Sequence, residues 1–201
     1  MGIQIFNSDG SLFFETGAHV LTSVPGFTEE IGKIAATWAV AEGHLGCYYA
    51  VLLETTPDDA LKQLGKQGAS QVTKNSEAIA KEKLSGNELV TLLDLLNKLD
   101  SVRNRRNRVQ HDIWSRRAGE AHILYAVHVD DYRRLFLEMA ENAKDTDQAA
   151  GADRSITAAN KYAANAANAF TLESLKTLRT DIELVSTDLI KAFFEKLNIG
   201  G

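Results

Sequence analysis

The chain has 201 residues, of which 44% are hydrophobic and 24% are charged, and its formal net charge is −5. This length and composition suit a globular protein with a sizeable core, and the acidic balance argues against a general nucleic-acid coat or a membrane-surface protein. Cys47 is the only cysteine, which excludes an intrachain disulfide and fits a reducing compartment. No secretion signal or membrane-spanning run is evident, so we expect a cytoplasmic protein.

Residues 1–26 are predicted to contain a β-hairpin, because apolar runs at 3–6 and 11–15 flank the turn-forming sequence Asn-Ser-Asp-Gly. A helix follows over residues 28–53, with Thr28 as its cap and apolar residues at helical spacing. Glu42 falls in the middle of the apolar face of this helix. An unpaired carboxylate is costly to bury, so the pattern predicts an ion pair between Glu42 and an arginine of another helix.

Two more helices are predicted before residue 115. The sequence Thr-Pro-Asp-Asp at 56–59 is typical of a helix start. The helix that it begins is weakly apolar, is interrupted by Gly65 and Gly68, and extends to about residue 84. A leucine-rich helix then covers residues 88–114. Residues 28–114 are therefore predicted to form a helical core.

The second half of the chain is predicted to add one strand and further helices. Apolar residues alternate over 122–129, which indicates a strand, and the N-terminal hairpin is its candidate partner. Residues 131–198 are assigned to C-terminal helices, one of them ending near 144 and the last beginning at Thr171. The alanine- and asparagine-rich segment 145–169 resembles a loop followed by a weak helix. Without a repeat or a clear boundary, residues 1–201 are predicted to form a single, mainly α domain with a small β appendage.

A basic island occupies the C-terminal half of the leucine-rich helix. Residues 98–117 include seven basic residues against Asp100 and Asp112, a local charge of +5. On a helical wheel one side of this segment carries two amides, an imidazole and an aromatic ring, flanked by two arginines: Asn104, Asn107, His111, Trp114, Arg103 and Arg108. Guanidinium groups bind phosphate, amides bind a base or sugar, and rings stack, so the pattern predicts a nucleotide site. The alternative is a solvated helix end whose positive charge favours the helix dipole.

Arg106-Asn107, followed by three residues and His111, resembles the Arg-x4-6-His motif of the HEPN superfamily. The leucine-rich helix before the motif and Trp114 after it are similar to the family's context, and the resemblance covers about residues 28–114. It implies a small α-helical bundle that is usually dimeric. Many members are metal-independent endoribonucleases, often toxins or antiviral factors, whereas others have lost catalysis and serve as binding modules.

The resemblance implies that Arg106 and His111 form the catalytic pair and that Asn107 is the polar residue beside them. Histidine can act as general base on a ribose 2′-hydroxyl, and arginine can stabilise the phosphate in the transition state. The candidate phosphate- or nucleotide-binding residues are Arg103, Asn104, Arg108 and Trp114. Ile113 stands where one toxin group has a tyrosine that a partner nucleotidyltransferase modifies, so that control is not expected here.

Arg106 and His111 are about 140° apart on a regular helix. Either the helix is distorted, or Arg103, Arg108 or an arginine of a second subunit completes the site. Arg106 also falls on the apolar side of its helix, where it is the natural partner of Glu42 in a structural ion pair.

Three hypotheses for the function follow. The main one is a metal-independent endoribonuclease without a cofactor, acting as a homodimer on RNA, with an antitoxin protein as a further candidate partner and no membrane partner. The second is a catalytically inactive HEPN-like dimer that binds a nucleotide or a protein. The third is a plain helical interaction protein.

Overall fold

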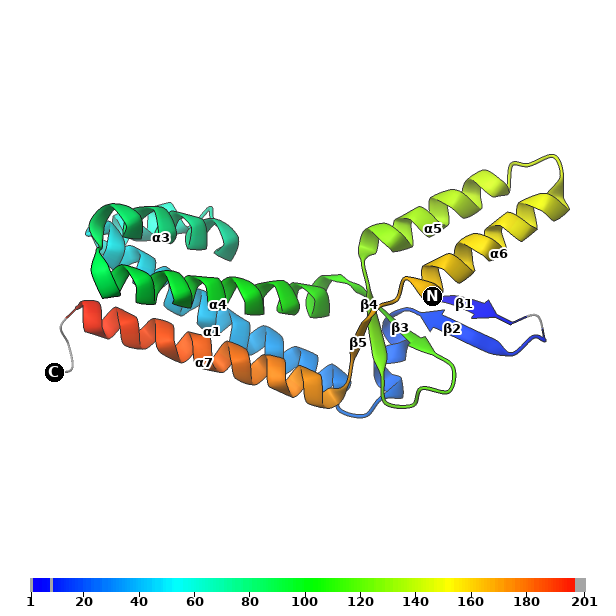
Figure 1. Ribbon diagram of the computed structural model, residues 1–201, viewed down its shortest axis with the longest axis horizontal. Helices are drawn as coiled ribbons and strands as arrows, with labels where there is room; N and C mark the ends of the chain where they lie inside the picture. The colour runs from blue at the N-terminus through cyan, green and yellow to red at the C-terminus, as the bar shows by residue number, and fades with distance from the viewer. Residues whose placement is uncertain (1, 8, 198–201) are drawn as a thin grey trace. The chain divides into compact units, whose positions relative to one another are not determined.

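The structure is a computed structural model that describes residues 2–7 and 9–197. The predicted end of the C-terminal helices at residue 198 lies outside these ranges, as do Met1 and Ser8 of the predicted hairpin region. The fold is mainly α with a small antiparallel sheet, which confirms the predicted class (Figure 1). Within the described ranges, no helix has both the length and the apolar character needed to cross a bilayer.

The chain divides into two compact units. We call Met1–Ile31 with Asn107–Lys176 the sheet unit, and Gly32–Arg106 with Thr177–Gly201 the helical unit. Three helices pass from one unit into the other, namely α1 (Phe27–Leu53), α4 (Gly86–His111) and α7 (Leu172–Lys196). Each change of unit therefore falls inside a regular helix, where no linker or change in composition marks it. This is why the sequence predicted a single domain.

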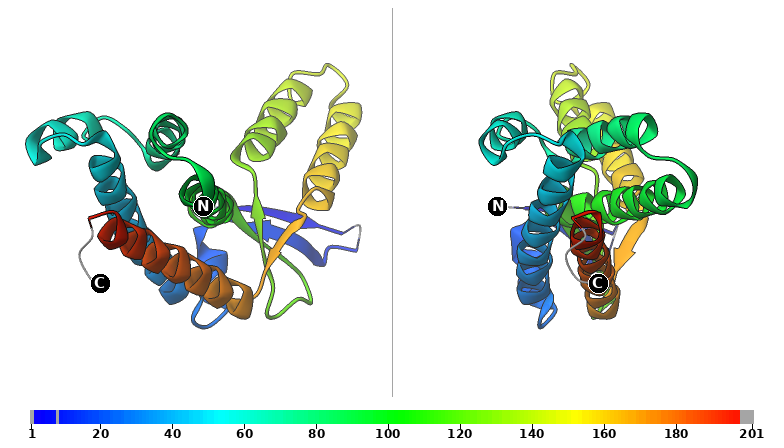
Figure 2. Two further views of the ribbon diagram at one scale, coloured as in Figure 1. Left: turned by 60° about the vertical axis from the view of Figure 1, so that its left-hand side comes forward. Right: turned by 90° about the vertical axis from the view of Figure 1, so that its left-hand side faces the viewer.

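The helical unit contains most of α1, α4 and α7, together with the shorter α2 (Pro57–Leu64) and α3 (Ala69–Lys83) (Figure 1 and Figure 2). Nδ1 of His44 in α1 lies 2.9 Å from the backbone oxygen of Ser186 in α7, so these two helices are neighbours. Large apolar side chains from the long helices are fully buried in this unit: Ile34, Trp38, Leu45, Leu52, Leu99, Leu178, Ile182 and Leu189. Burial of this apolar surface is the main force that holds the helices together.

The predicted interruption of the helix over 57–84 at Gly65 and Gly68 divides this segment into two helices. Thr56 caps α2 as expected, since its hydroxyl accepts a hydrogen bond from the backbone N–H of Asp59 at 3.3 Å. Gly65 ends α2 and Gly68 precedes α3. Glycine has a weak helix propensity, and two glycines within four residues stop the helix.

The sheet unit is built around a five-stranded antiparallel sheet in the order β1-β2-β3-β4-β5. Its strands are β1 (Ile3–Phe6), β2 (Leu12–Thr16), β3 (Ile113–Arg117), β4 (Leu124–Val127) and β5 (Asn168–Phe170). The predicted N-terminal hairpin and the later strand are both confirmed. Their predicted pairing is wrong, because β3 lies between them and takes the central place in the sheet.

Strand β3 also corrects the predicted end of the leucine-rich helix. Helix α4 ends at His111, and the chain continues as a strand from Ile113 instead of as a helix to Trp114. The apolar residues at 109, 113 and 114 fit a helical period as well as a strand, so the sequence alone did not separate the two. Residues 113–117 form a strand because β3 pairs with β2 on one side and with β4 on the other.

Helices α5 (Val129–Asn142) and α6 (Gln148–Ala164) form a helical hairpin that packs on one face of the sheet. Phe14 of β2 contacts Tyr162 of α6 edge-to-face, with ring centroids 5.9 Å apart. The segment predicted as a loop and weak helix therefore contains a regular helix and β5. Helix α6 forms because Asp147 caps it, accepting hydrogen bonds from the backbone N–H groups of residues 149 and 150, and because alanine favours helix.

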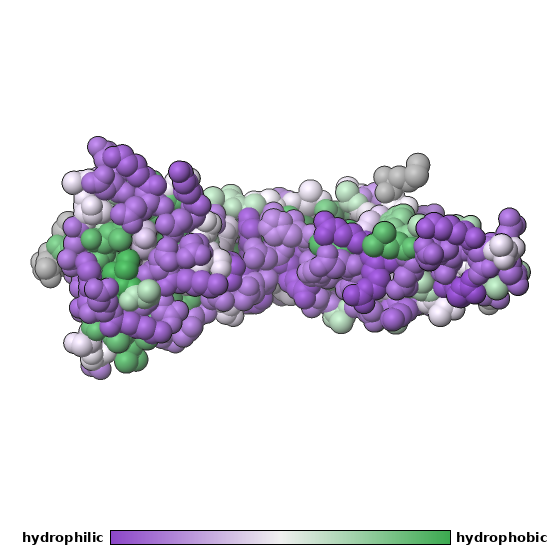
Figure 3. Space-filling model, turned by 90° about the horizontal axis from the view of Figure 1, so that it is seen from above, coloured by the Kyte–Doolittle hydropathy of each residue, from purple (hydrophilic) through white to green (hydrophobic). Residues whose placement is uncertain are grey.

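The face of the molecule drawn in Figure 3 is mainly hydrophilic and is interrupted by small hydrophobic patches. Charged side chains cover most helix surfaces, and many of them form pairs one turn apart, such as Lys81 with Glu77 and Lys98 with Asp94. Exposed pairs of this kind contribute little to stability, and they keep the surface polar.

Candidate functional site

The arginines and amides predicted to bind phosphate lie in the second half of α4. In the helical unit, Arg103 donates two hydrogen bonds to Oδ1 of Asp100, at 3.0 and 2.6 Å. Asn104 donates to the other carboxylate oxygen of Asp100 at 3.3 Å. The structure therefore brings Arg103 and Asn104 together, as the wheel predicted, around a carboxylate to which the sequence analysis gave no role.

Two further arginines of the basic island are also held by carboxylates. Arg105 forms an ion pair with Asp181 of α7 in the helical unit. In the sheet unit, Arg108 contacts Asp112 at 2.7 Å, and the Asp112 side chain is only 5% exposed. The ion pairs of Arg103 and Arg105 are partly exposed and are typically worth between zero and about 1 kcal/mol, so a phosphate group can replace their carboxylates at little cost. Asp112 is buried, so separating it from Arg108 would be costly.

Arg106 has different surroundings. Its guanidinium carbon lies 5.7 Å from the centre of the Trp38 ring, within the range of a cation–π contact. Burial lowers the pKa of Arg106, and the negative charge of Glu42 partly opposes this effect. The guanidinium is still a cation at neutral pH, because an arginine side chain does not lose its charge in a protein. Arg106 is thus a half-buried cation that contacts α1.

Glu42 is exposed, so the prediction that α1 buries this carboxylate is wrong. The side chains that α1 buries around this position are those of Trp38, Ala41 and Leu45, and Glu42 is not one of them. Glu42 instead lines a groove of about 600 Å³ between α1 and α2. Its charge acts on Arg106 in the predicted direction, since it raises the pKa of the guanidinium.

His111 and Asn107 occupy the last turns of α4 within the sheet unit. His111 is the final residue of the helix and is exposed to solvent, whereas Asn107 is half-buried. Arg106 is the last α4 residue that belongs to the helical unit. The motif therefore runs along one continuous helix and ends with an accessible imidazole.

Trp114 is a core residue, so its predicted role as a nucleotide-stacking ring is wrong. It is 6% exposed and packs edge-to-face against Phe27 and Phe170, with ring centroids 6.0 and 5.4 Å apart. Its indole N–H donates to the backbone oxygen of Val109 at 3.2 Å. The wheel placed Trp114 beside His111 because it continued the helix past residue 111, whereas Trp114 belongs to β3.

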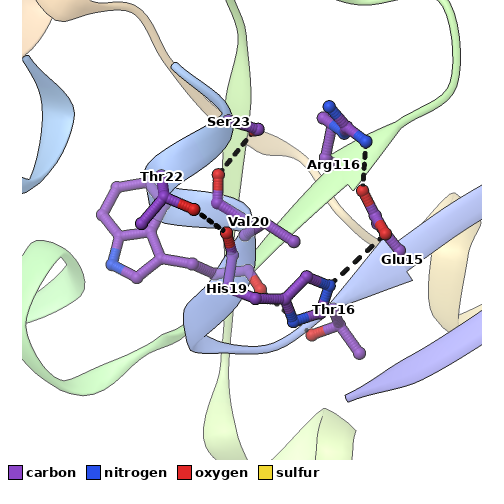
Figure 4. Close-up of polar contacts among 8 residues, drawn as sticks. Glu15, Thr16, His19, Val20, Thr22, Ser23 and Arg116 are labelled. Atoms are coloured by element: carbon purple, nitrogen blue, oxygen red, sulfur yellow. Dashed lines mark hydrogen bonds and ion pairs between the residues drawn. The ribbon is translucent and has the colours of Figure 1, made fainter. Parts of the chain in front are cut away.

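A polar cluster that the sequence analysis missed lies in the sheet unit (Figure 4). Glu15 of β2 is buried and forms an ion pair with Arg116, which lies directly opposite in β3. Nε2 of His19 lies 3.3 Å from the other oxygen of Glu15. Burial alone would raise the pKa of Glu15, but the hydrogen bond to His19 and the charge of Arg116 outweigh it and lower this pKa.

One more arginine of the basic island, Arg116, belongs to this cluster. Arg116 faces a buried carboxylate, so we assign it to the structure of the sheet and not to phosphate binding. A single sequence carried no signal for the pair, because the register of β2 and β3 creates it from distant segments. His19 is half-exposed beside the pair, and Gly17 at φ 138° lies against its ring where a Cβ atom would crowd it.

The arrangement at the end of α4 supports proton transfer and anion binding. An exposed imidazole can accept a proton, and guanidinium groups in exchangeable ion pairs can bind phosphate. In the part of the chain that the structure describes, no three His, Cys, Asp or Glu side chains are grouped to hold a metal ion. Comparison with protein-family models, curated proteins and solved structures finds no match to this chain. The residues of α4 and their surroundings are therefore the observations that bear on function.

Proposed function

We propose that this chain is a HEPN-type, metal-independent endoribonuclease that acts in the cytoplasm as a homodimer. The observation that carries the proposal is the exposed imidazole of His111 at the end of α4, in the sequence Arg106-Asn107-x3-His111. The mainly α architecture fits the helical bundle that the motif implies. A toxin or defence role would follow from this activity, with an antitoxin as the controlling partner.

In the proposed reaction, His111 removes the proton from a ribose 2′-hydroxyl. The resulting oxygen attacks the adjacent phosphorus, the bond from phosphorus to the 5′-oxygen breaks, and the leaving oxygen takes up a proton. The products are a 2′,3′-cyclic phosphate and a 5′-hydroxyl end. Arg106 stabilises the additional negative charge on the phosphate, and Asn107 orients it.

Neighbouring phosphates of the RNA would bind Arg103 and Asn104 in exchange for Asp100, and would bind Arg108 in addition to its buried partner Asp112. Arg106 and His111 diverge by about 140° around a regular helix, so one copy does not aim both groups at the same phosphate. A second copy that supplies the missing arginine resolves this geometry, which is why the proposal specifies a homodimer.

The test is cleavage of total RNA by purified protein in the presence of EDTA. We expect His111→Ala to lower the rate by a factor on the order of 10² or more, because general-base catalysis contributes that much. His122→Ala is the matched control, since His122 is an exposed histidine outside α4, and it should cleave like the unmodified chain. Equal cleavage by the His111→Ala protein, or loss of all cleavage in EDTA, would contradict the proposal.

Arg106→Ala extends the test to phosphate stabilisation. We expect a loss on the order of 10²-fold, compared with no loss for Arg133→Ala, which removes an exposed arginine of α5. Because Arg106 also contacts Trp38, rates are compared per folded molecule, with the folded fraction measured by circular dichroism. Similar rates for both variants would remove Arg106 from the site.

A second function is favoured by the carboxylates Asp100, Asp112 and Asp181, which hold three arginines of the basic island. These contacts lower the positive potential that RNA would meet, as expected of a catalytically inactive HEPN-like dimer that binds a nucleotide or a protein partner. Such a protein would cleave nothing in the RNA experiment, and a nucleotide would raise its melting temperature. No cleavage and no response to any nucleotide would indicate a plain helical interaction protein.

A further inference from the structure

A cavity of about 510 Å³ lies in the helical unit and is lined by residues of α1, the first turns of α4 and the last turns of α7. Its size is within the range of about 300–1,000 Å³ that is typical of small-molecule sites. Leu92 and Leu95 of α4 form an apolar part of its wall. The polar side chains of its lining are Tyr48, Asn87, Glu88, Thr91, Glu195 and Lys196. None of these residues belongs to the proposed nuclease site.

Tyr48 is the buried polar group of this cavity, with 3% of the residue exposed. Burial, together with the charges of Glu88 and Glu195, raises the pKa of Tyr48 to about 12. Both carboxylates line the same cavity, so the hydroxyl end of the Tyr48 ring lies at it. Among the residues that the structure describes, none forms a hydrogen bond with this hydroxyl. Because the Tyr48 ring is buried and its residue lines the cavity, a ligand in the cavity can form a hydrogen bond with the hydroxyl.

The two carboxylates of the cavity differ in their partners. Glu88 lies in the first turn of α4, where the helix dipole favours it, and Nζ of Lys196 contacts it at 2.7 Å. Glu195 is exposed, and within residues 2–7 and 9–197 no cation forms an ion pair with it. The cavity therefore combines an apolar wall, the hydroxyl of a buried tyrosine and one carboxylate without an ion-pair partner among the described residues.

We propose that this cavity binds a small organic cation, namely a primary ammonium group on a short alkyl chain. The ammonium donates hydrogen bonds to the carboxylate of Glu195 and the hydroxyl oxygen of Tyr48, and the alkyl chain packs against Leu92 and Leu95. An anion is disfavoured because two carboxylates face the cavity. A neutral alcohol would gain the apolar contacts but not the attraction to Glu195.

The test is calorimetric titration of the whole chain with n-butylamine, n-butanol and butyrate near neutral pH and at low ionic strength. We expect the amine to bind at least about tenfold more tightly than the alcohol, and butyrate not to bind, because only the amine forms a charge-assisted hydrogen bond. Glu195→Gln and Tyr48→Phe should each weaken amine binding by about tenfold. The controls are Glu82→Gln, an exposed carboxylate of α3, and Tyr49→Phe, an equally buried tyrosine that does not line the cavity.

Equal binding of the amine and the alcohol would overturn the proposal and leave an unspecific apolar cavity. Full retention of amine affinity in the Glu195→Gln protein, or no binding of the amine at all, would also overturn it. The His111→Ala protein should bind the amine normally, since His111 lies outside this cavity. The amine proposal and the nuclease proposal can therefore fail independently of each other.

Discussion

Arg106 and Arg108 are two positions apart in α4, but their different surroundings suit them to different roles. Arg106 contacts the ring of Trp38, and its pKa is lowered by burial, whereas Arg108 is half-exposed and contacts Asp112. A half-buried guanidinium is suited to stabilising one fixed charge, whereas a half-exposed one can also bind an anion that approaches from solvent. The motif that contains both arginines was visible in the sequence. The partners were not all visible, because Asp181 and Trp38 come from distant helices.

Trp114 gives a prediction at the same scale. Trp114→Ala should lower the free energy of unfolding by about 3–5 kcal/mol, because it removes a buried ring that packs against Phe27 and Phe170. Urea unfolding measures this loss. Phe6→Ala is the control, since Phe6 is 53% exposed and its removal should cost less than about 1 kcal/mol. Similar losses for both variants would mean that Trp114 is not a core residue.

Arg117 connects two elements of the sheet unit. Its guanidinium lies over the Tyr125 ring, 4.4 Å from the ring centre. It also donates hydrogen bonds to the backbone oxygens of Ala163 at 3.4 Å and Ala166 at 3.1 Å, at the C-terminal end of α6. The last carbonyl groups of a helix lack partners within it, so Arg117 both caps α6 and ties it to β3.

Arg117→Met tests this connection, because methionine keeps much of the length of the side chain and loses its charge and donors. We expect a loss of about 1–3 kcal/mol in unfolding free energy, since carbonyl groups lose charged donors. Amide hydrogen exchange should also speed up in the last turn of α6. Arg133→Met, on the exposed side of α5, should change neither quantity. Unchanged exchange in α6 of the Arg117→Met protein would contradict the assigned role.

Elements with strong local signals were predictable from the sequence, and those set by distant pairing were not. The cap and proline at 56–57 fixed the start of α2, and the regular apolar stripe of α7 fixed that helix. The interruption at Gly65 and Gly68 was visible in the sequence, whereas the strand at Ile113 depended on a weaker signal that competes with a helical period. The same holds for the candidate site. Its motif is a local feature of the sequence and was predictable, whereas the exposure of Glu42 depends on distant parts of the chain and was not.

At the scale of the whole molecule, three continuous helices join the sheet unit and the helical unit. Each of α1, α4 and α7 contributes residues to both units. Helix formation is cooperative, so unwinding such a helix in one unit favours its unwinding in the other. We therefore expect the chain to unfold in a single transition despite its two compact units.

The two tryptophans make this expectation measurable, because Trp38 lies in the helical unit and Trp114 in the sheet unit. Trp38→Phe leaves a reporter of the sheet unit, and Trp114→Phe leaves a reporter of the helical unit. In each variant, the urea midpoint from fluorescence should equal the midpoint from far-UV circular dichroism, which follows the whole chain. A fluorescence midpoint that differs from the dichroism midpoint in either variant would show that the units unfold separately.

The outer strands of the sheet have a consequence for behaviour at high concentration. Strand β1 has four residues and an irregular register near its end, and β5 has only three. Short or irregular edge strands present few unpaired backbone groups to another molecule, so they are poor templates for amyloid-like growth. A concentrated solution of this protein should therefore resist fibril formation even though Phe6 is exposed at one border.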